Sequence, residues 1–168
     1  IVSVLLGQKP ETVTGRGAGL SGAGLIRKIS AIERALAVNA PDPADPLDVL
    51  AKVGGFDLAG LCGIFLGGAA YHVPIVVDGF ISAAAALVAQ RICPAARDYM
   101  LASHISNEPA GRMTLSALGL KPLICAEMRL GEGTGAVALF PLLDMALAVY
   151  NEMSTFDQIA LEEYKPLS

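Results

Sequence analysis

The chain of 168 residues is long enough for one domain with a substantial core, and it is 54% hydrophobic but only 17% charged. Because an average soluble domain is less apolar, we expect another element or another chain to cover much of its surface. The net charge is −4 and the sequence has no basic run, which argues against nucleic acid as a partner. Small anionic ligands would need a local basic site instead.

The first residues predict the end of a helix, in which an apolar segment from Ile1 to Leu6 is stopped by Gly7 and then Pro10. The sequence starts without Met, so we expect it to be a piece of a longer protein. No basic region precedes the apolar residues, and no signal peptide is expected.

A glycine-rich segment at residues 15–19 precedes a helix predicted from Ser21, its N-cap, to about Val38. Lys28 falls in the first turns of this helix. Backbone N–H groups and the helix N-terminus could bind an anion there, although the loop follows no strand and is not a Walker loop. The alternative for Lys28 is an ordinary surface lysine.

Helices continue after a Pro-rich loop at residues 41–46. A short helix is predicted over residues 47–53, and Asp57 is expected to cap the next one, which runs from Leu58 to about Ala70. The glycines of that second helix suggest close packing against a neighbouring element.

The clearest strand in the sequence is Val73 to Val77, which ends in Asp78-Gly79 and precedes an Ala-rich helix over residues 81–91. A strand, a tight turn and a helix form one unit of a parallel sheet, in which ligands bind beyond the carboxyl ends of the strands. Asp78 lies at such an end. The sequence favours Asp78 as the cap of the helix, and an orienting role at a ligand cleft is the alternative.

A second strand is predicted over residues 99–102, followed by a polar run and a helix that starts at Pro109 and ends near Gly119. Within the polar run, Ser106 and Asn107 could be helix caps or site residues. His104 is interpreted as an interior histidine and is not included among the catalytic residues.

Residues 128–136 place one carboxylate, Glu132, between two glycines and three residues after Arg129. Glycines on both sides permit a positive φ and leave room for a planar molecule. With Leu130 nearby, we expect Glu132 to lie in apolar surroundings. The simpler interpretation is a turn that places Glu132 near the N-terminal dipole of the next helix, predicted from Ala136 to about Met153, where Pro141 causes a kink or marks the true start.

The apolar runs are too interrupted or too short for a membrane span and fit buried strands and helices of a parallel-sheet protein. Cys62, Cys93 and Cys125 are expected to be buried free thiols in a reducing, cytoplasmic compartment. No metal site is expected, because the chain has no Cys-x-x-Cys pair and its histidines are far apart in sequence.

Five motifs occur in one order along the chain, and together they resemble the C-terminal half of the nicotinate-nucleotide:dimethylbenzimidazole phosphoribosyltransferases of cobalamin biosynthesis. The motifs are residues 15–19 with Lys28, Val-Asp-Gly-Phe at 77–80, His-Ile-Ser-Asn-Glu-Pro at 104–109, the segment around Glu132, and Ser-Thr-Phe at 154–156. The resemblance implies an α/β fold with a parallel sheet and Rossmann-like connections, with C-terminal helices that belong to a small helical domain. Residues 1–120 would complete the nucleotide-binding domain, and residues 121–168 would form the active-site loop and the helical segment.

The resemblance also implies an activity. Family members transfer the phosphoribosyl group of nicotinate mononucleotide to 5,6-dimethylbenzimidazole, giving α-ribazole 5′-phosphate and nicotinate, without a cofactor and as homodimers. Glu132 falls on the general base, and Lys28 with Gly17 on the phosphate site. Ser106, Arg129, Leu130 and Gly131 fall on nucleotide contacts. Alternatively, Arg129 could pair with Glu127 or another acid on the surface.

Three hypotheses remain at this point. In the first, the chain is half of an active phosphoribosyltransferase and is inactive by itself. In the second, it is a catalytically incomplete piece that retains only its fold and dimer contacts. In the third, it is part of another α/β enzyme that uses a nucleotide. Members of the family are about twice as long, and the missing half would carry a phosphate loop and much of the benzimidazole pocket.

Overall fold

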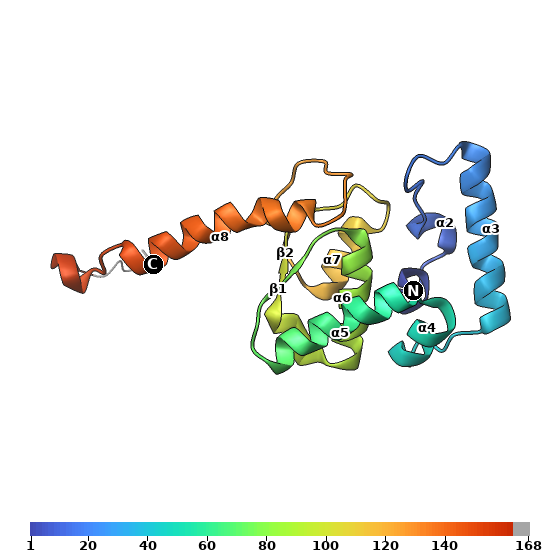
Figure 1. Cartoon of the computed structure of the whole chain (residues 1–168), viewed down its shortest axis with the longest axis horizontal. Helices are drawn as coiled ribbons and strands as arrows, with labels where there is room; N and C mark the ends of the chain where they lie inside the picture. The colour runs from blue at the N-terminus through green and yellow to red at the C-terminus, as the bar shows by residue number, and fades with distance from the viewer. Residues whose placement is uncertain (163–168) are drawn as a thin grey trace, which may run out of the picture.

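The computed structural model describes residues 1–162 and has the mixed α/β organisation expected from the sequence (Figure 1). The α-helices are α1 (Val2–Leu5), α2 (Pro10–Val13), α3 (Gly22–Asn39), α4 (Pro46–Val53), α5 (Phe56–Ala70), α6 (Phe80–Ile92), α7 (Gly111–Leu118) and α8 (Thr134–Glu152). The strands are β1 (Ile75–Val77) and β2 (Met100–Ala102), and short 3₁₀ helices are η1 (Pro94–Tyr99) and η2 (Asp157–Ile159).

The two strands pair in parallel, which confirms the predicted parallel unit. Ile75 is opposite Met100 and Val77 is opposite Ala102, and α6 and η1 form the crossover between the strands. An isolated parallel bridge between His104 and Ile124 adds a third segment beside the residues that follow β2. The turn after β1 and the loop after β2 therefore begin at the same edge of the sheet.

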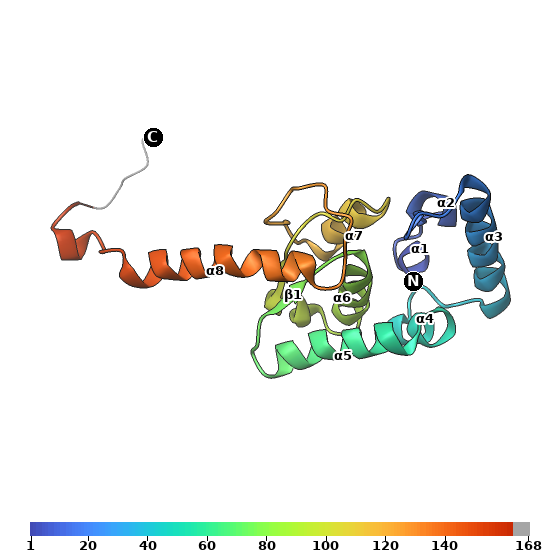
Figure 2. The ribbon, with the colours of Figure 1, turned by 45° about the horizontal axis from the view of Figure 1, so that its top comes forward.

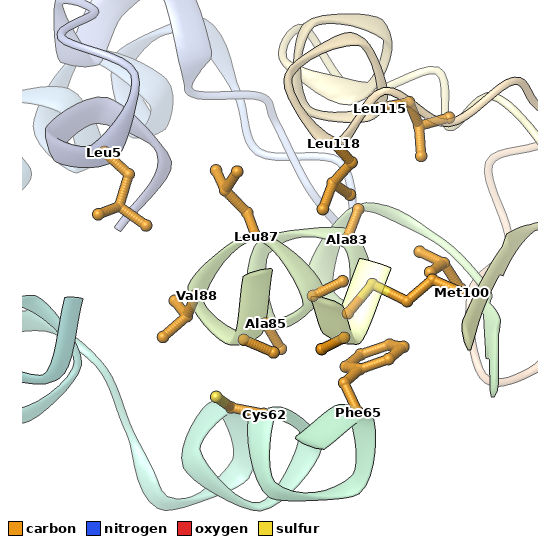
Figure 3. Packing of buried hydrophobic residues seen from close by; sticks show 14 of the residues in the cluster. Leu5, Cys62, Phe65, Ala83, Ala85, Leu87, Val88, Met100, Leu115 and Leu118 are labelled. Carbon is orange, nitrogen blue, oxygen red and sulfur yellow. The ribbon is translucent and has the colours of Figure 1, made fainter. Parts of the chain in front are cut away.

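The core is built around α6, whose residues 83–89 are all buried (Figure 3). Its alanines allow the neighbouring helices to approach closely. Cys62 and Phe65 of α5 pack on one side, and Leu115 and Leu118 of α7 pack on another. Leu87 and Leu118 are completely buried, so α6 is the element that fixes the positions of the surrounding helices and of the sheet.

Helix ends follow local capping chemistry, with some corrections to the predicted ends. Ser21 caps α3 as predicted by accepting a hydrogen bond from the Gly24 N–H, and Gly119 ends α7 with a φ of 67°. Asp57 does not cap α5, because that helix begins one residue earlier at Phe56, with Gly55 as its N-cap. Pro109 likewise precedes α7, whose first residue is Gly111.

The chain opens in a helix as predicted, but Pro10 is the first residue of α2 rather than only a stop signal. A proline is tolerated there because the first N–H of a helix has no intrahelical partner.

Helix α8 projects away from the rest of the chain, as both views show (Figures 1 and 2). It begins at Thr134, two residues before the predicted start, and Pro141 lies inside it. Large apolar side chains are exposed along its length: Val137, Phe140, Leu142, Met145, Leu147, Val149 and Tyr150. By length and composition alone, α8 is the one helix among residues 1–162 that could cross a membrane, although one apolar helix of this kind is weak evidence for a span.

The three cysteines differ in their surroundings, which corrects the expectation that all are buried. Cys62 is buried in the core, Cys93 is partly exposed and Cys125 is exposed. Burial raises the pKa of the Cys62 thiol, because the thiolate would lose its hydration in the core.

Candidate functional site

An open cleft of about 1150 Å³ lies at the edge of the sheet where the turn after β1 and the loop after β2 begin. Its walls come from the glycine-rich segment, from α3 and α5, from both strand-end loops and from the segment that precedes α8. All of the site residues predicted from the sequence line this cleft: Gly17, Lys28, Asp78, Ser106, Arg129, Leu130, Gly131 and Glu132. Segments separated by more than a hundred residues in the sequence therefore meet at one site.

Lys28 is tied to the glycine-rich segment by a hydrogen bond from its Nζ to the Gly15 carbonyl, at 2.9 Å. Gly17 has a φ of 56°, and a Cβ added there would lie 3.9 Å from the Lys28 Nζ. A Cβ on Gly15 would overlap the Glu108 carboxylate and lie 2.8 Å from the Pro109 Cδ, so a larger residue there would have to displace the loop after β2. Within residues 1–162 Lys28 forms no ion pair, and its ammonium charge remains available to an anion at the cleft wall.

Asp78 does not cap α6, the interpretation that the sequence favoured. That helix begins after Gly79, without a side-chain cap. The Asp78 carboxylate instead accepts hydrogen bonds from the Gly133 N–H at 3.1 Å and from the Ala136 N–H at 3.0 Å. These donors belong to the start of α8, which carries no other side-chain cap. Asp78 therefore connects the end of β1 to the segment that carries Glu132.

Glu132 itself adopts the left-handed backbone conformation, with a φ of 60°, and Gly133 follows with a φ of 81°. Gly131, which was expected to share this role, does not have a positive φ. A left-handed conformation costs a residue with a side chain roughly 1–2 kcal/mol, so surrounding contacts must hold it. The Thr134 hydroxyl donates to the Gly131 carbonyl at 2.8 Å, and Asp78 binds Gly133 from the other side.

The expected apolar surroundings of Glu132 are absent from residues 1–162. Glu132 is exposed, and the Leu130 side chain is 67% exposed. Glu132 also makes no capping hydrogen bond to α8, whose N-cap is Gly133. Its carboxylate is therefore free to receive a proton from a molecule in the cleft.

Ser106 and Asn107 do not cap α7, since the N-cap of that helix is Ala110. The Ser106 hydroxyl accepts a hydrogen bond from the Glu108 N–H at 3.4 Å within the loop. The Asn107 amide oxygen, turned toward Arg129, accepts from its Nη2 at 2.9 Å and its Nε at 3.0 Å. Because an uncharged amide holds Arg129 without neutralising it, the guanidinium keeps its positive charge at the cleft. No ion pair links it to Glu127 in the part of the chain that the structure describes.

The chemistry of the cleft follows from these groups. Lys28 and Arg129 supply two cations for anionic groups of a ligand, and Glu132 supplies a proton acceptor on a segment with little side-chain bulk. No group of three or more histidine, cysteine or acidic side chains that could hold a metal ion is found among the described residues. The arrangement is suited to a reaction in which an anionic substrate is bound and Glu132 accepts a proton.

The sequence interpreted His104 as an interior histidine, which its burial confirms, but did not indicate that it also lines the cleft. Asn107 was left open as a cap or a site residue, and the structure places it on Arg129. The available signal was their place in a polar run directly after a strand. Arg129, which Asn107 binds, and Gly135, against which His104 packs, are remote in sequence and could not be identified from spacing.

The chain is similar to known proteins over nearly its whole length. A family model described as "Phosphoribosyltransferase" matches residues 1–160. A nicotinate-nucleotide–dimethylbenzimidazole phosphoribosyltransferase of Ruminiclostridium cellulolyticum is 53% identical over 167 residues, which cover 99% of this chain and 47% of that protein. The enzyme of the same name from Desulforudis audaxviator is 55% identical over 165 residues, covering 98% of this chain and 47% of its own.

Solved structures give the same result. The crystal structure of CobT from Thermus thermophilus superposes with a TM-score of 0.88 at 44% identity, over 97% of this chain and 48% of that one. The chain thus spans about half the length of the curated relatives it matches.

Proposed function

Since the chain belongs to the phosphoribosyltransferase family whose model matches residues 1–160, we propose that the complete gene product transfers the phosphoribosyl group of nicotinate mononucleotide to 5,6-dimethylbenzimidazole. The products are α-ribazole 5′-phosphate, used in the nucleotide loop of cobalamin, and nicotinate. The observation that carries this proposal is the convergence of Lys28, Arg129 and Glu132 on one cleft. The names of the relatives support the choice of substrates.

The displacement occurs at C1′ of the ribose and inverts it. One nitrogen of the benzimidazole forms the new bond to C1′, and the bond from C1′ to the pyridinium nitrogen breaks. Its electron pair returns to the nicotinate ring, which leaves without the positive charge. The other benzimidazole nitrogen must lose its proton, because the product ring is neutral.

Glu132 takes this proton as the general base. Its carboxylate lies at the cleft, is not engaged in a capping hydrogen bond, and is followed by Gly133, which leaves room for a flat ring. General-base catalysis contributes a factor of about 100 to 10,000 to a rate, and this is the loss expected when the carboxylate is removed.

Substrate binding uses the cations and the glycine backbone. Lys28 and Gly17 bind the 5′-phosphate, since the lysine is anchored to the glycine-rich segment and carries an unneutralised charge. Arg129, Leu130, Gly131 and Ser106 contact the rest of the nucleotide. Asp78 acts as a positioning residue, because its two hydrogen bonds hold the start of α8 next to Glu132.

Larger features of the protein are part of the same proposal. The β1–α6–β2 unit belongs to a Rossmann-like sheet, with residues 1–120 in the nucleotide-binding domain. Residues 121–168 are assigned to the active-site loop and part of a helical domain, and the last six of them lie outside the described residues. The exposed apolar side chains of α8 support a covered position, in that domain and in a homodimer, rather than a membrane position. The protein is placed in the cytoplasm, where the substrates of a biosynthetic enzyme are found.

The test is an incubation of the complete gene product with nicotinate mononucleotide and dimethylbenzimidazole, with chromatographic separation of the products. The proposal requires equal amounts of nicotinate and α-ribazole 5′-phosphate. Nicotinate released without the ribazole, or no turnover at all, contradicts it.

Binding measured on the chain of 168 residues alone tests the second hypothesis, that of a piece which retains only its fold and dimer contacts. We propose that it binds nicotinate mononucleotide weakly but does not turn it over, because much of the benzimidazole pocket belongs to the other half. Calorimetry that detects no binding to the folded chain would instead favour a piece that retains only its fold and dimer contacts.

A further inference from the structure

A buried polar pair, Ser103 and His104, lies directly after β2, with His104 at the cleft wall. Ser103 is 0% exposed and His104 is 3% exposed. The Ser103 hydroxyl lies 2.8 Å from the Val77 carbonyl, 2.8 Å from the Asp78 carbonyl and 3.0 Å from the His104 Nδ1. The pair therefore connects the end of β1 to an imidazole at the cleft.

The donors and acceptors of this cluster determine which nitrogen of the His104 imidazole carries the proton. A serine hydroxyl has one proton to donate, and carbonyl oxygens can only accept. With two carbonyls beside it, Ser103 donates to one of them. The 3.0 Å contact with His104 then needs its proton from Nδ1. In a neutral imidazole the other nitrogen, Nε2, is left with a lone pair and accepts.

The His104 Nε2 has no hydrogen-bond partner among residues 1–162. Every completely buried side-chain nitrogen or oxygen in the described residues does have a partner, so Nε2 must reach the open space of the cleft. The ring has little freedom to turn away, because a Cβ added to Gly135 would overlap its Nδ1 and Cε1. A nearly buried side chain thus presents one unpaired acceptor to the ligand site.

We infer that the His104 Nε2 accepts a hydrogen bond from a ribose hydroxyl of the bound nucleotide, an inference that rests on the proposed function. An acceptor excludes the phosphate and the carboxylate as partners, since both are acceptors when ionised. The single N–H of dimethylbenzimidazole is assigned to Glu132. The 2′- and 3′-hydroxyls of the ribose are the donors that remain on the two substrates.

The histidine offers two substitutions that separate its two nitrogens. In His104→Asn the amide nitrogen can replace Nδ1 and keep the contact with Ser103, but nothing reaches the position of Nε2. In His104→Gln the amide oxygen can replace Nε2 at the cleft, while the contact with Ser103 is lost. If His104 serves only the fold, His104→Gln should show the larger loss of kcat/KM. If it contacts the ribose, His104→Asn should show the larger loss.

The experiment measures kcat/KM of the complete gene product for nicotinate mononucleotide and for its 2′-deoxy and 3′-deoxy forms. Removing the contacting hydroxyl from the substrate is expected to cost the wild type a factor of about 10 from the lost hydrogen bond. The same removal should cost His104→Asn almost nothing extra, and should cost His104→Gln nearly as much as the wild type. Any change in intrinsic reactivity of the deoxy sugars cancels, because it occurs in every variant.

The outcomes are distinct. A wild type that forms no α-ribazole 5′-phosphate contradicts the proposed function. An active wild type with equal deoxy penalties in His104→Asn overturns the assignment of His104 while leaving the proposed function intact. If His104→Asn does not fold in a thermal melt, the comparison of the wild type with His104→Gln decides: loss of the deoxy penalty in Gln relative to the wild type overturns the assignment.

Discussion

The hydrogen bonds from the start of α8 to Asp78 predict that the Asp78 carboxylate raises kcat although it takes no part in the reaction itself. Asp78→Ala removes the acceptor of two backbone N–H groups, at 3.1 and 3.0 Å, that hold the segment carrying Glu132. Loss of a helix cap costs about 1–2 kcal/mol. The left-handed φ of 60° at Glu132 then lacks part of the support that offsets its strain.

The magnitude for catalysis follows from this free energy. If the cap energy of about 1–2 kcal/mol is lost from the positioned segment, its population falls, and kcat falls by a factor of about 5 to 30. Asp78→Asn keeps one acceptor oxygen, so its kcat should fall less than that of Asp78→Ala. Because Asp78 acts through the segment rather than on the nucleotide phosphate, kcat should fall more than KM rises.

The matched control is Asp45→Ala. Asp45 caps α4 through the N–H groups of Leu47 and Asp48, at 2.9 and 3.2 Å, and does not line the cleft. Both alanine variants should lower Tm by similar amounts, whereas only Asp78→Ala should lower kcat. Steady-state kinetics of the complete gene product and thermal unfolding provide the two readouts. A folded Asp78→Ala protein with kcat within a factor of about 2 of wild type would refute the positioning argument.

Further predictions concern binding, packing and thiol chemistry. Lys28→Met should raise KM for nicotinate mononucleotide by about 10-fold or more through loss of a charged contact to phosphate. Lys52→Met should not, because Lys52 does not line the cleft, and equal KM values for the two variants would contradict the assignment of Lys28 to the phosphate site. Leu118→Ala, at a side chain that is 0% exposed, should lower the free energy of unfolding in urea by about 2–5 kcal/mol, against less than about 0.5 kcal/mol for Ile26→Ala, which is 70% exposed; a small effect at Leu118 would contradict the packing around α6. Iodoacetamide should modify the exposed Cys125 before Cys62, and because burial raises the pKa of Cys62, its thiolate and its alkylation should appear only at higher pH; peptide mapping that finds Cys62 modified first would contradict its burial.

Local signals in the sequence identified much of the fold. The Ser21 cap, the strand before Asp78 and the glycine after α7 depend on residues within a few positions of one another, and the structure agrees with each of them. The parallel pairing followed from a strand, a helix and a second strand. The errors at Asp57 and Pro109 are displacements of a helix start, because several neighbouring residues could serve as the N-cap.

Long-range contacts set the limit of sequence reasoning at the site. Motif order placed the site residues at one cleft, but Asp78 binds N–H groups more than fifty residues away, and Asn107 holds an arginine from another loop. The same limitation applies to burial. Cys125 was expected in the core from its apolar neighbours in sequence, but it lies on an exposed loop after the bridge at Ile124.

The central claim is that Glu132 is the base in phosphoribosyl transfer, and its most direct test is the rate of the complete gene product with Glu132→Gln. The matched control is Glu127→Gln, a carboxamide substitution in the same segment that does not line the cleft. With nicotinate mononucleotide and dimethylbenzimidazole, Glu132→Gln should form α-ribazole 5′-phosphate at a rate lower by a factor of about 100 or more, while Glu127→Gln stays near wild type. A folded Glu132→Gln protein with a near-normal rate would contradict the account and place the base elsewhere in the protein.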